Sequence, residues 1–190
     1  MMRSMRRCGG VLLVGLAACT AAPPKHATPA FDAAALVATI RAAGAASTTE
    51  LDVQPLRDPQ VEDLRQQATQ LEQKHMYRGA ADLLDQAMAI NPDDPALIQE
   101  RAELALLLRN PVEAEQLARR AIDLGSTTGP LCRRHWETLL QTALLRADDR
   151  VIRDDESEAE ATQRVGDAAA EARQARTQRE ACTVAAPNRF

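Results

Sequence analysis

Cysteine is the residue type in this chain with the widest chemistry, and four cysteines occur among its 190 residues. The segment in front of Cys19 has arginines at positions 3, 6 and 7, then an apolar run from 11 to 16, and then small residues. A basic start, a short apolar run and a small-residue end are the plan of an export signal. The sequence therefore predicts an exported protein in a compartment where disulfides persist.

The residues that close this signal are Leu16-Ala17-Ala18-Cys19. They resemble the lipobox of bacterial lipoproteins, in which the signal is removed before the cysteine and the cysteine takes up lipid. The resemblance implies a signal peptide over residues 1–18, lipidation at Cys19 and attachment to a membrane. Thr20 stands where lipoproteins held at the inner membrane often have aspartate, so the resemblance favours the outer membrane, facing the periplasm. A plain secretory signal, cut without lipidation, is the alternative.

A membrane-spanning helix is not predicted from this segment. Such a helix needs about 20 consecutive apolar residues, and the run before Cys19 has roughly half that length. Pro23, Pro24 and Lys25 follow directly, and they end any apolar span.

Two thiols remain once Cys8 leaves with the signal and Cys19 carries lipid, namely Cys132 and Cys182. Helices over about 131–150 and 155–182 would run antiparallel and bring Cys182 back toward Cys132. A metal or redox site that also uses His135 is the alternative, although it has no clear fourth ligand. We expect a structural disulfide.

Catalytic residues show no arrangement of the usual kind. His26, His75 and His135 are scattered, and the chain has no nucleophile elbow, no phosphate-cradling glycine loop and no zinc-binding HExxH. The acidic cluster from 148 to 156 lacks the alternating oxygens and central glycine of a calcium loop. The sequence predicts a protein that is not an enzyme and that has no cofactor and no metal.

Charge and composition bear on two further questions, whether the protein binds nucleic acid and which fold class it has. The net charge is −4 at pH 7, and loss of the signal, with three arginines and no acid, makes it −7. An acidic chain lacks the basic face that nucleic-acid binding needs, so that class is excluded. Aromatic residues make up only 2%, and strands favour the aromatic and branched residues that are scarce here. We expect an all-α fold.

A repeat appears when the chain is compared with itself shifted by 34 residues, because small and large apolar residues then coincide. The matched pairs are Leu64 with Ile98, Ala68 with Ala102, Ala80 with Ala114, Ala87 with Ala121, and Ile90 with Leu124. These residues resemble the tetratricopeptide repeat (TPR) family, whose unit is a helix-turn-helix. The second repeat departs from the family at Ala105, Ala118 and Ser126. The resemblance implies a short array of helical hairpins.

The predicted organisation has five parts. They are a signal peptide (1–18), a lipid-anchored and flexible tether rich in Ala, Pro and Thr (19–60), two TPR-like repeats (61–128), a C-terminal helical hairpin that caps them (129–182) and a tail (183–190). One short helix is predicted inside the tether, with Thr28 as its cap, Pro29 at its first position and Gly44 at its end. Leu36, Ile40 and Ala43 share a face of this helix, which either spaces the domain from the bilayer or docks on it.

Binding is the function that the resemblance implies, since the first helix of each TPR unit faces a concave groove. Carried over by position, the residues that would line the groove and bind a partner are Arg65, Thr69, Glu72, Gln73, Gln99, Glu103, Leu106 and Leu107. The alternative for Leu106 and Leu107 is packing against the third unit or the tether helix. We expect an adaptor for a periplasmic protein in envelope assembly or regulation. A self-associating structural lipoprotein with no heterologous partner, a homo-oligomer, is the alternative.

Overall fold

The computed structural model describes residues 31–45, 58–149 and 155–183, and its ordered elements there are seven α-helices and no strand. The all-α prediction is confirmed. The helices are α1 (Ala33–Ala43), α2 (Pro59–Gln73), α3 (Tyr77–Ile90), α4 (Pro95–Leu107), α5 (Pro111–Leu124), α6 (Gly129–Asp148) and α7 (Glu158–Ala181). The predicted signal, Cys19, the residues expected to cap the first helix and the tail from 184 lie outside the described residues.

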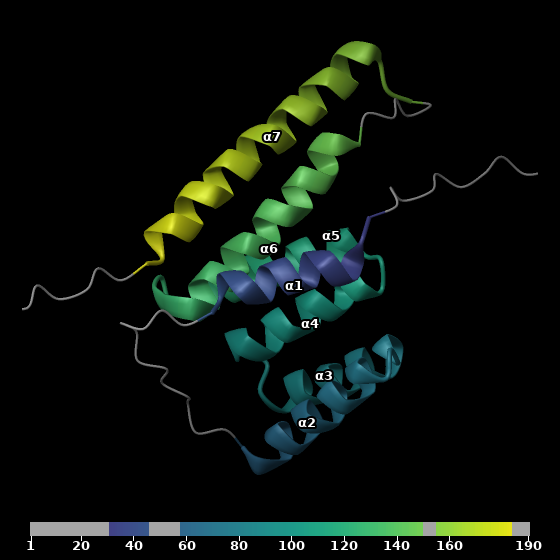
Figure 1. Ribbon diagram of the computed structural model, residues 1–190, viewed down its shortest axis with the longest axis vertical. Helices are drawn as coiled ribbons and strands as arrows, with labels where there is room; N and C mark the ends of the chain where they lie inside the picture. Colours follow the sequence, from purple (N-terminus) through teal and green to yellow (C-terminus); the bar gives the residue numbers. More distant parts are fainter. Residues whose placement is uncertain (1–30, 46–57, 150–154, 184–190) are drawn as a thin grey trace, which may run out of the picture.

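Helices α2 to α7 form three antiparallel hairpins that stack in chain order (Figure 1). Each hairpin packs on the next through neighbouring helices, α3 on α4 and α5 on α6. Small residues make this close stacking possible: Ala68, Ala80, Ala87, Ala102 and Ala114 are all buried. The structure therefore has the predicted helical-hairpin array, including the C-terminal hairpin.

The first two hairpins turn in the same way, 34 residues apart. His75 and Arg109 both take left-handed backbone angles, with φ of 58° and 63°. The amide of Met76 donates to the carbonyl of Leu71 at 2.9 Å, and the amide of Asn110 donates to that of Ala105 at 2.8 Å. The backbone repeats with the period found in the sequence.

Proline and a capping side chain start three of these helices. Asp58, Asp94 and Asn110 each accept a backbone hydrogen bond at a helix N-terminus, and each is followed by proline. Proline fits the first helical position because its missing N–H would have no helical partner. The expected start of the first repeat was too late, since α2 already begins at Pro59, inside the predicted tether.

Helix α1 also differs from its prediction. It begins at Ala33, where Asp32 accepts a hydrogen bond from the amide of Ala35 at 3.0 Å, so Pro29 is not its first residue. Its buried side chains are Ala33, Val37 and Ile40, and it packs on α4 and α6 (Figure 1). Docking on the domain, one of the two alternatives, is therefore the observed one.

The C-terminal hairpin packs mostly methyl groups and is joined by a disulfide. On α7 the buried residues are alanines, Ala161, Ala168, Ala172 and Ala175. Cys132 and Cys182 form the predicted disulfide, with Cα atoms 5.8 Å apart. Both sulfurs are thereby used, which leaves no thiol for the alternative metal or redox site with His135.

Candidate functional site

The candidate site is a cleft on the face formed by α2, α4 and α6, which we call the inner face. The cleft has a volume of about 440 Å³. Its lining comes from α2, α4 and α6, from the end of α1 and from Leu84 of α3. The lining residues are Arg41, Gly44, Arg65, Ala68, Thr69, Glu72, Gln73, Leu84, Glu100, Leu104 and Arg134.

Four of the eight predicted groove residues lie in this cleft: Arg65, Thr69, Glu72 and Gln73, all on α2. The last three follow Arg65 by four, seven and eight residues, which places all four on one helical face. Thr69 and Gln73 are exposed. We call the surface formed by these four residues and Glu100 the open half of the inner face.

The other predicted groove residues lie beneath α1 and α6. Gln99, Glu103 and Leu106 have no exposed surface, and Leu107 is half-buried. The prediction that they line an open groove is wrong for Gln99, Glu103 and Leu106, because α1 and α6 cover this part of α4. We call this part of the inner face the covered half.

Apolar packing holds α1 on the covered half. Val37 and Ile40 contact a cluster formed by Ala105, Leu106 and Ala114. The alternative interpretation of Leu106, packing against the helix of the tether, is the observed one.

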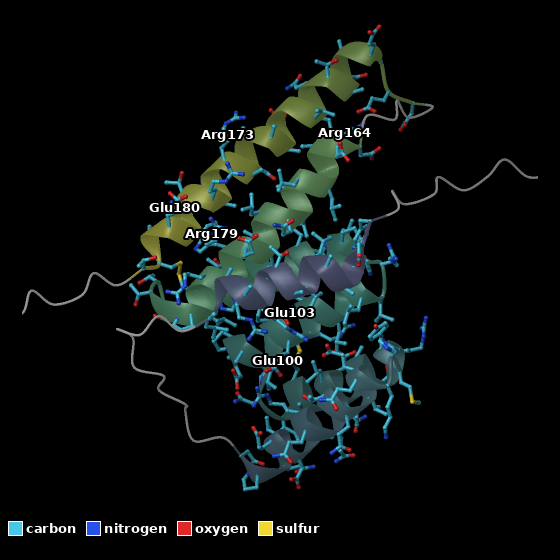
Figure 2. The ribbon with its side chains drawn as sticks, viewed as in Figure 1. Glu100, Glu103, Arg164, Arg173, Arg179 and Glu180 are labelled. Carbon is cyan, nitrogen blue, oxygen red and sulfur yellow. A yellow bond between two sulfur atoms is a disulfide. The ribbon has the colours of Figure 1, made fainter. Side chains whose placement is uncertain are left out.

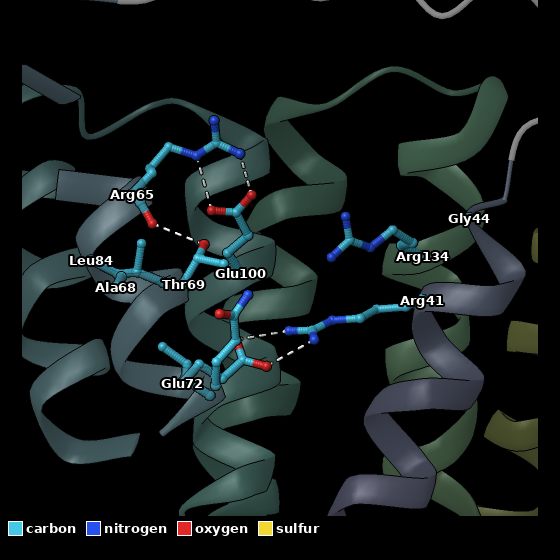
Figure 3. Close-up of a pocket in the computed structure, with 11 residues that line it drawn as sticks. Arg41, Gly44, Arg65, Ala68, Thr69, Glu72, Leu84, Glu100 and Arg134 are labelled. Carbon is cyan, nitrogen blue, oxygen red and sulfur yellow. Dashed lines mark hydrogen bonds and ion pairs between the residues drawn. The ribbon is translucent and has the colours of Figure 1, made fainter. Parts of the chain in front are cut away.

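Charged groups tie α1 to two helices at once. The guanidinium of Arg41 donates through Nε to Glu103 Oε2 at 2.8 Å and through both terminal nitrogens to Glu72, at 2.8 and 3.0 Å. Partial burial acts to lower the pKa of Arg41, but the bonds to Glu72 and the charge of Glu103 outweigh it and raise that pKa. Arg41 therefore stays charged and joins α1 to α4 and α2. Figure 3 shows its two bonds to Glu72 of α2.

A polar network lies under α1 and fixes Glu103. Glu103 Oε1 accepts hydrogen bonds from Arg134 Nε and Gln99 Nε2, each at 3.0 Å. Gln99 Nε2 is also 2.9 Å from Thr138 Oγ1, and His135 Nδ1 lies 2.8 Å from Gln99 Oε1. A buried carboxylate is tolerated only when it is bonded in this way.

His135 is neutral in this network. Since the amide nitrogen of Gln99 is used as a donor, its oxygen accepts, and His135 must carry its proton on Nδ1. Burial lowers the pKa of His135 to about 4, and the charge of Arg134 adds to the effect. The bond between His135 and Gln99 joins residues 36 apart in the sequence, and no local pattern predicts it.

Gly44 lets α1 approach α6 closely. A Cβ atom at this position would lie 2.3 Å from Arg134 Cγ and 3.1 Å from the carbonyl oxygen of Pro130. Arg133 donates from Nε to the carbonyl of Ala43 at 3.0 Å, which gives a backbone carbonyl at the C-terminal end of α1 a hydrogen-bond partner. Gly44 was predicted as the end of the helix, but its close approach to Arg134 was not.

The open half carries both signs of charge around an apolar floor. Arg65 binds Glu100 through two nitrogens (Figure 3). A third nitrogen of Arg65 donates to Glu62 at 2.8 Å. Ala68, Leu84 and Leu104 form the floor. Glu100 and Glu103 lie one helical turn apart on α4 (Figure 2). Glu100 lines the open cleft, whereas Glu103 is buried beneath α1.

Sequence reasoning missed three charged residues of the cleft: Arg41, Glu100 and Arg134. Arg41 lay in the predicted tether helix, and only the docking of α1 brings it to Glu72 and Glu103. Glu100 could have been found, since its position in the second repeat is one turn from Glu103.

The described residues contain no group of three or more histidine, cysteine, aspartate or glutamate side chains placed to hold a metal ion. Within the same residues, no helix is long and apolar enough to cross a bilayer. No protein-family model matches the chain, and a search of curated proteins finds no significant relative.

Proposed function

We propose that this protein is a lipid-anchored adaptor of the bacterial envelope, a TPR-type hairpin array that binds a periplasmic protein on its inner face. The observation that carries the proposal is the open half, a cleft of about 440 Å³ lined by the first helices of successive hairpins. Its surface is made of paired charges and exposed polar groups over an apolar floor. Such a surface suits a protein segment, which offers both apolar and polar groups, better than a small anion or nucleic acid.

The proposed location of the protein at a membrane depends on Cys19 and the residues before it. Lipid on Cys19 would hold the chain at a membrane, because several acyl chains anchor a protein stably. Thr20, where lipoproteins of the inner membrane often have aspartate, favours the outer one. The expected result is that the mature chain incorporates palmitate and fractionates with membranes, and that Cys19→Ser abolishes both. Membrane retention of that variant at the wild-type level would overturn the lipid anchor.

The adaptor role is tested by affinity capture from solubilised envelopes. Thr69→Glu with Gln73→Glu adds two charges to the open half at exposed positions. The matched control is Gln86→Glu with Gln116→Glu, which adds two charges at exposed positions of α3 and α5 outside the cleft. We expect one discrete protein to be captured by wild type and control and lost from the first variant. Equal capture by all three chains would overturn the proposal.

A structural lipoprotein that self-associates is the second candidate, and docking of α1 favours it, because the chain itself fills half of its inner face. Light scattering of the chain without its signal separates the two, with a stable dimer expected only for the structural protein. Leu106→Glu is a poor probe of such a dimer because Leu106 is buried under α1. Gln73→Glu, at an exposed position of the open half, disturbs the fold less.

A further inference from the structure

Helix α1 does not pack on the next helix in the chain, as the other helices do. Helices α2 to α7 each pack on the next helix in the chain, as expected for a hairpin array. Helix α1 instead lies across α4 and α6, away from its sequence neighbour α2, which it meets through Arg41 and Glu72 (Figure 1). It is therefore a ligand of the array rather than one of its units.

The residues with which α1 binds fall on one helical stripe. Val37, Ile40, Arg41 and Gly44 are spaced i, i+3, i+4 and i+7, the pattern by which an amphipathic helix lies on a partner surface. Two of them are apolar anchors, one is a cation held by two carboxylates, and one is small where α6 approaches. The outer side of α1, including Ala34, Ala38 and Thr39, is exposed.

The surface under α1 keeps most of its bonds when α1 is absent. Glu103 Oε1 is bonded by Arg134 and Gln99, both from the array itself, and Arg41 serves only Oε2. Without α1, Ala105, Leu106 and Ala114 would lose their apolar cover. Without α1, the array thus presents the positioned carboxylate of Glu103 beside an apolar strip. The groups that α1 supplied to this surface, one guanidinium and two apolar side chains, would then have to come from a partner.

From this complementarity we infer that the covered half is a second binding site, which takes an amphipathic helix of a partner in place of α1. The partner helix carries two apolar residues three positions apart, an arginine directly after the second and a small residue three positions later. Arginine is favoured over lysine because one guanidinium binds both Glu72 and Glu103. The inference rests on the proposed adaptor function and names the kind of partner that the inner face accepts.

The test uses the full chain without its signal, carrying Val37→Asp and Ile40→Asp so that its own α1 no longer docks. The probe is a fluorescein-labelled peptide of residues 31–45, followed by fluorescence anisotropy. We expect the variant chain to bind it at least tenfold more tightly than wild type, whose α1 competes. An Arg41→Glu peptide should bind at least tenfold more weakly, and an Ala38→Glu peptide, altered on the exposed side, should bind unchanged.

A second probe tests the chemistry of the partner alone. An unrelated alanine-based helix that carries only Val, Ile, Arg and Gly at the spacing of the stripe should also bind the variant chain. Failure of both peptides to bind a variant that keeps its helical circular dichroism would overturn the inference, and so would equal binding to wild type. If the wild-type protein instead forms a dimer in which the two copies exchange α1, the inference that the partner is a different protein would be overturned.

Hydrogen exchange of the wild-type chain decides the matter if the variant fails to fold. The inference requires amides of α1 to exchange at least tenfold faster than those of α4, because α1 leaves an intact array. Equal rates in α1 and α4 would make α1 part of one cooperative core and would overturn it. Neither result bears on capture through Thr69 and Gln73, so the adaptor proposal is tested separately.

Discussion

The two halves of the inner face meet on α4 and have different properties. In the covered half, Glu103 is completely buried, and it is bonded by Arg41, Arg134 and Gln99. In the open half, Glu100 lies one turn earlier on α4 and pairs with Arg65 at the edge of a cleft. The comparison shows that docking of one short helix turns part of the inner face into core, and that the position of a residue in a repeat does not fix its exposure.

The largest contrast is expected between these two glutamates. Glu103→Ala leaves Arg41 and Arg134 without their shared carboxylate, and removal of one partner from a buried pair costs about 3–5 kcal/mol. Glu100→Ala breaks a partly exposed pair, so we expect a loss of less than about 1 kcal/mol. Urea denaturation at pH 7 measures both. Similar losses for the two variants would contradict the division of the inner face.

The apolar anchor of α1 should give the next largest effect. Ile40→Ala removes buried methyl groups from the contact with Leu106, and we expect the free energy of unfolding to fall by about 2–4 kcal/mol. Thr39→Ala is the control on the exposed side of the same helix, with a change within about 0.5 kcal/mol. Thermal and urea denaturation followed by circular dichroism give the comparison. An Ile40→Ala chain as stable as wild type would mean that α1 contributes nothing to the fold.

The histidine beneath the covered half should make stability depend on pH. The pKa of His135 is lowered to about 4 in the folded chain, against about 6.5 when unfolded. The unfolded chain therefore binds more protons between these values, and stability falls as the pH falls through this window. From pH 7 to pH 5 the loss attributable to His135 is about 2 kcal/mol. A His135→Gln chain should lack this part of the slope, and an unchanged slope would refute the assignment.

The smallest effects on stability belong to the open half. Thr69→Ala and Gln73→Ala alter exposed side chains, so each should change the free energy of unfolding by no more than about 0.5 kcal/mol. Their effect should instead appear as reduced capture of the partner. A destabilisation above about 1 kcal/mol would show that these side chains serve the fold.

The array could be predicted from the sequence, and the position of α1 could not. The 34-residue period, the prolines at helix starts and the alanines between helices are local signals, and they located α2 to α5 within a few residues. The pairing of Cys132 with Cys182 followed from two helices of similar length that return on each other. The helix signals depend on neighbours in the chain, and the disulfide, although it joins residues 50 apart, joins two helices that follow one another directly.

The burial of Glu103 depends instead on a contact between distant segments. Arg41 and Glu103 are 62 residues apart in the sequence, and no periodicity connects them. The docking of α1 depends on the contacts of Val37 and Ile40 with α4, on the guanidinium of Arg41 and on the close approach at Gly44. None of these contacts is visible in a local sequence pattern. For that reason Arg65, Thr69, Glu72 and Gln73 were placed correctly in a cleft, whereas Gln99, Glu103 and Leu106 were not.

Site-specific photocrosslinking in the native envelope tests most directly whether the open half binds a partner. A photoreactive amino acid replaces Gln73 in one chain and Gln86, an exposed residue of α3 outside the cleft, in the other. We predict one adduct of defined mass from position 73 and none from position 86. The absence of an adduct at 73, or the same adducts at both positions, would contradict the account.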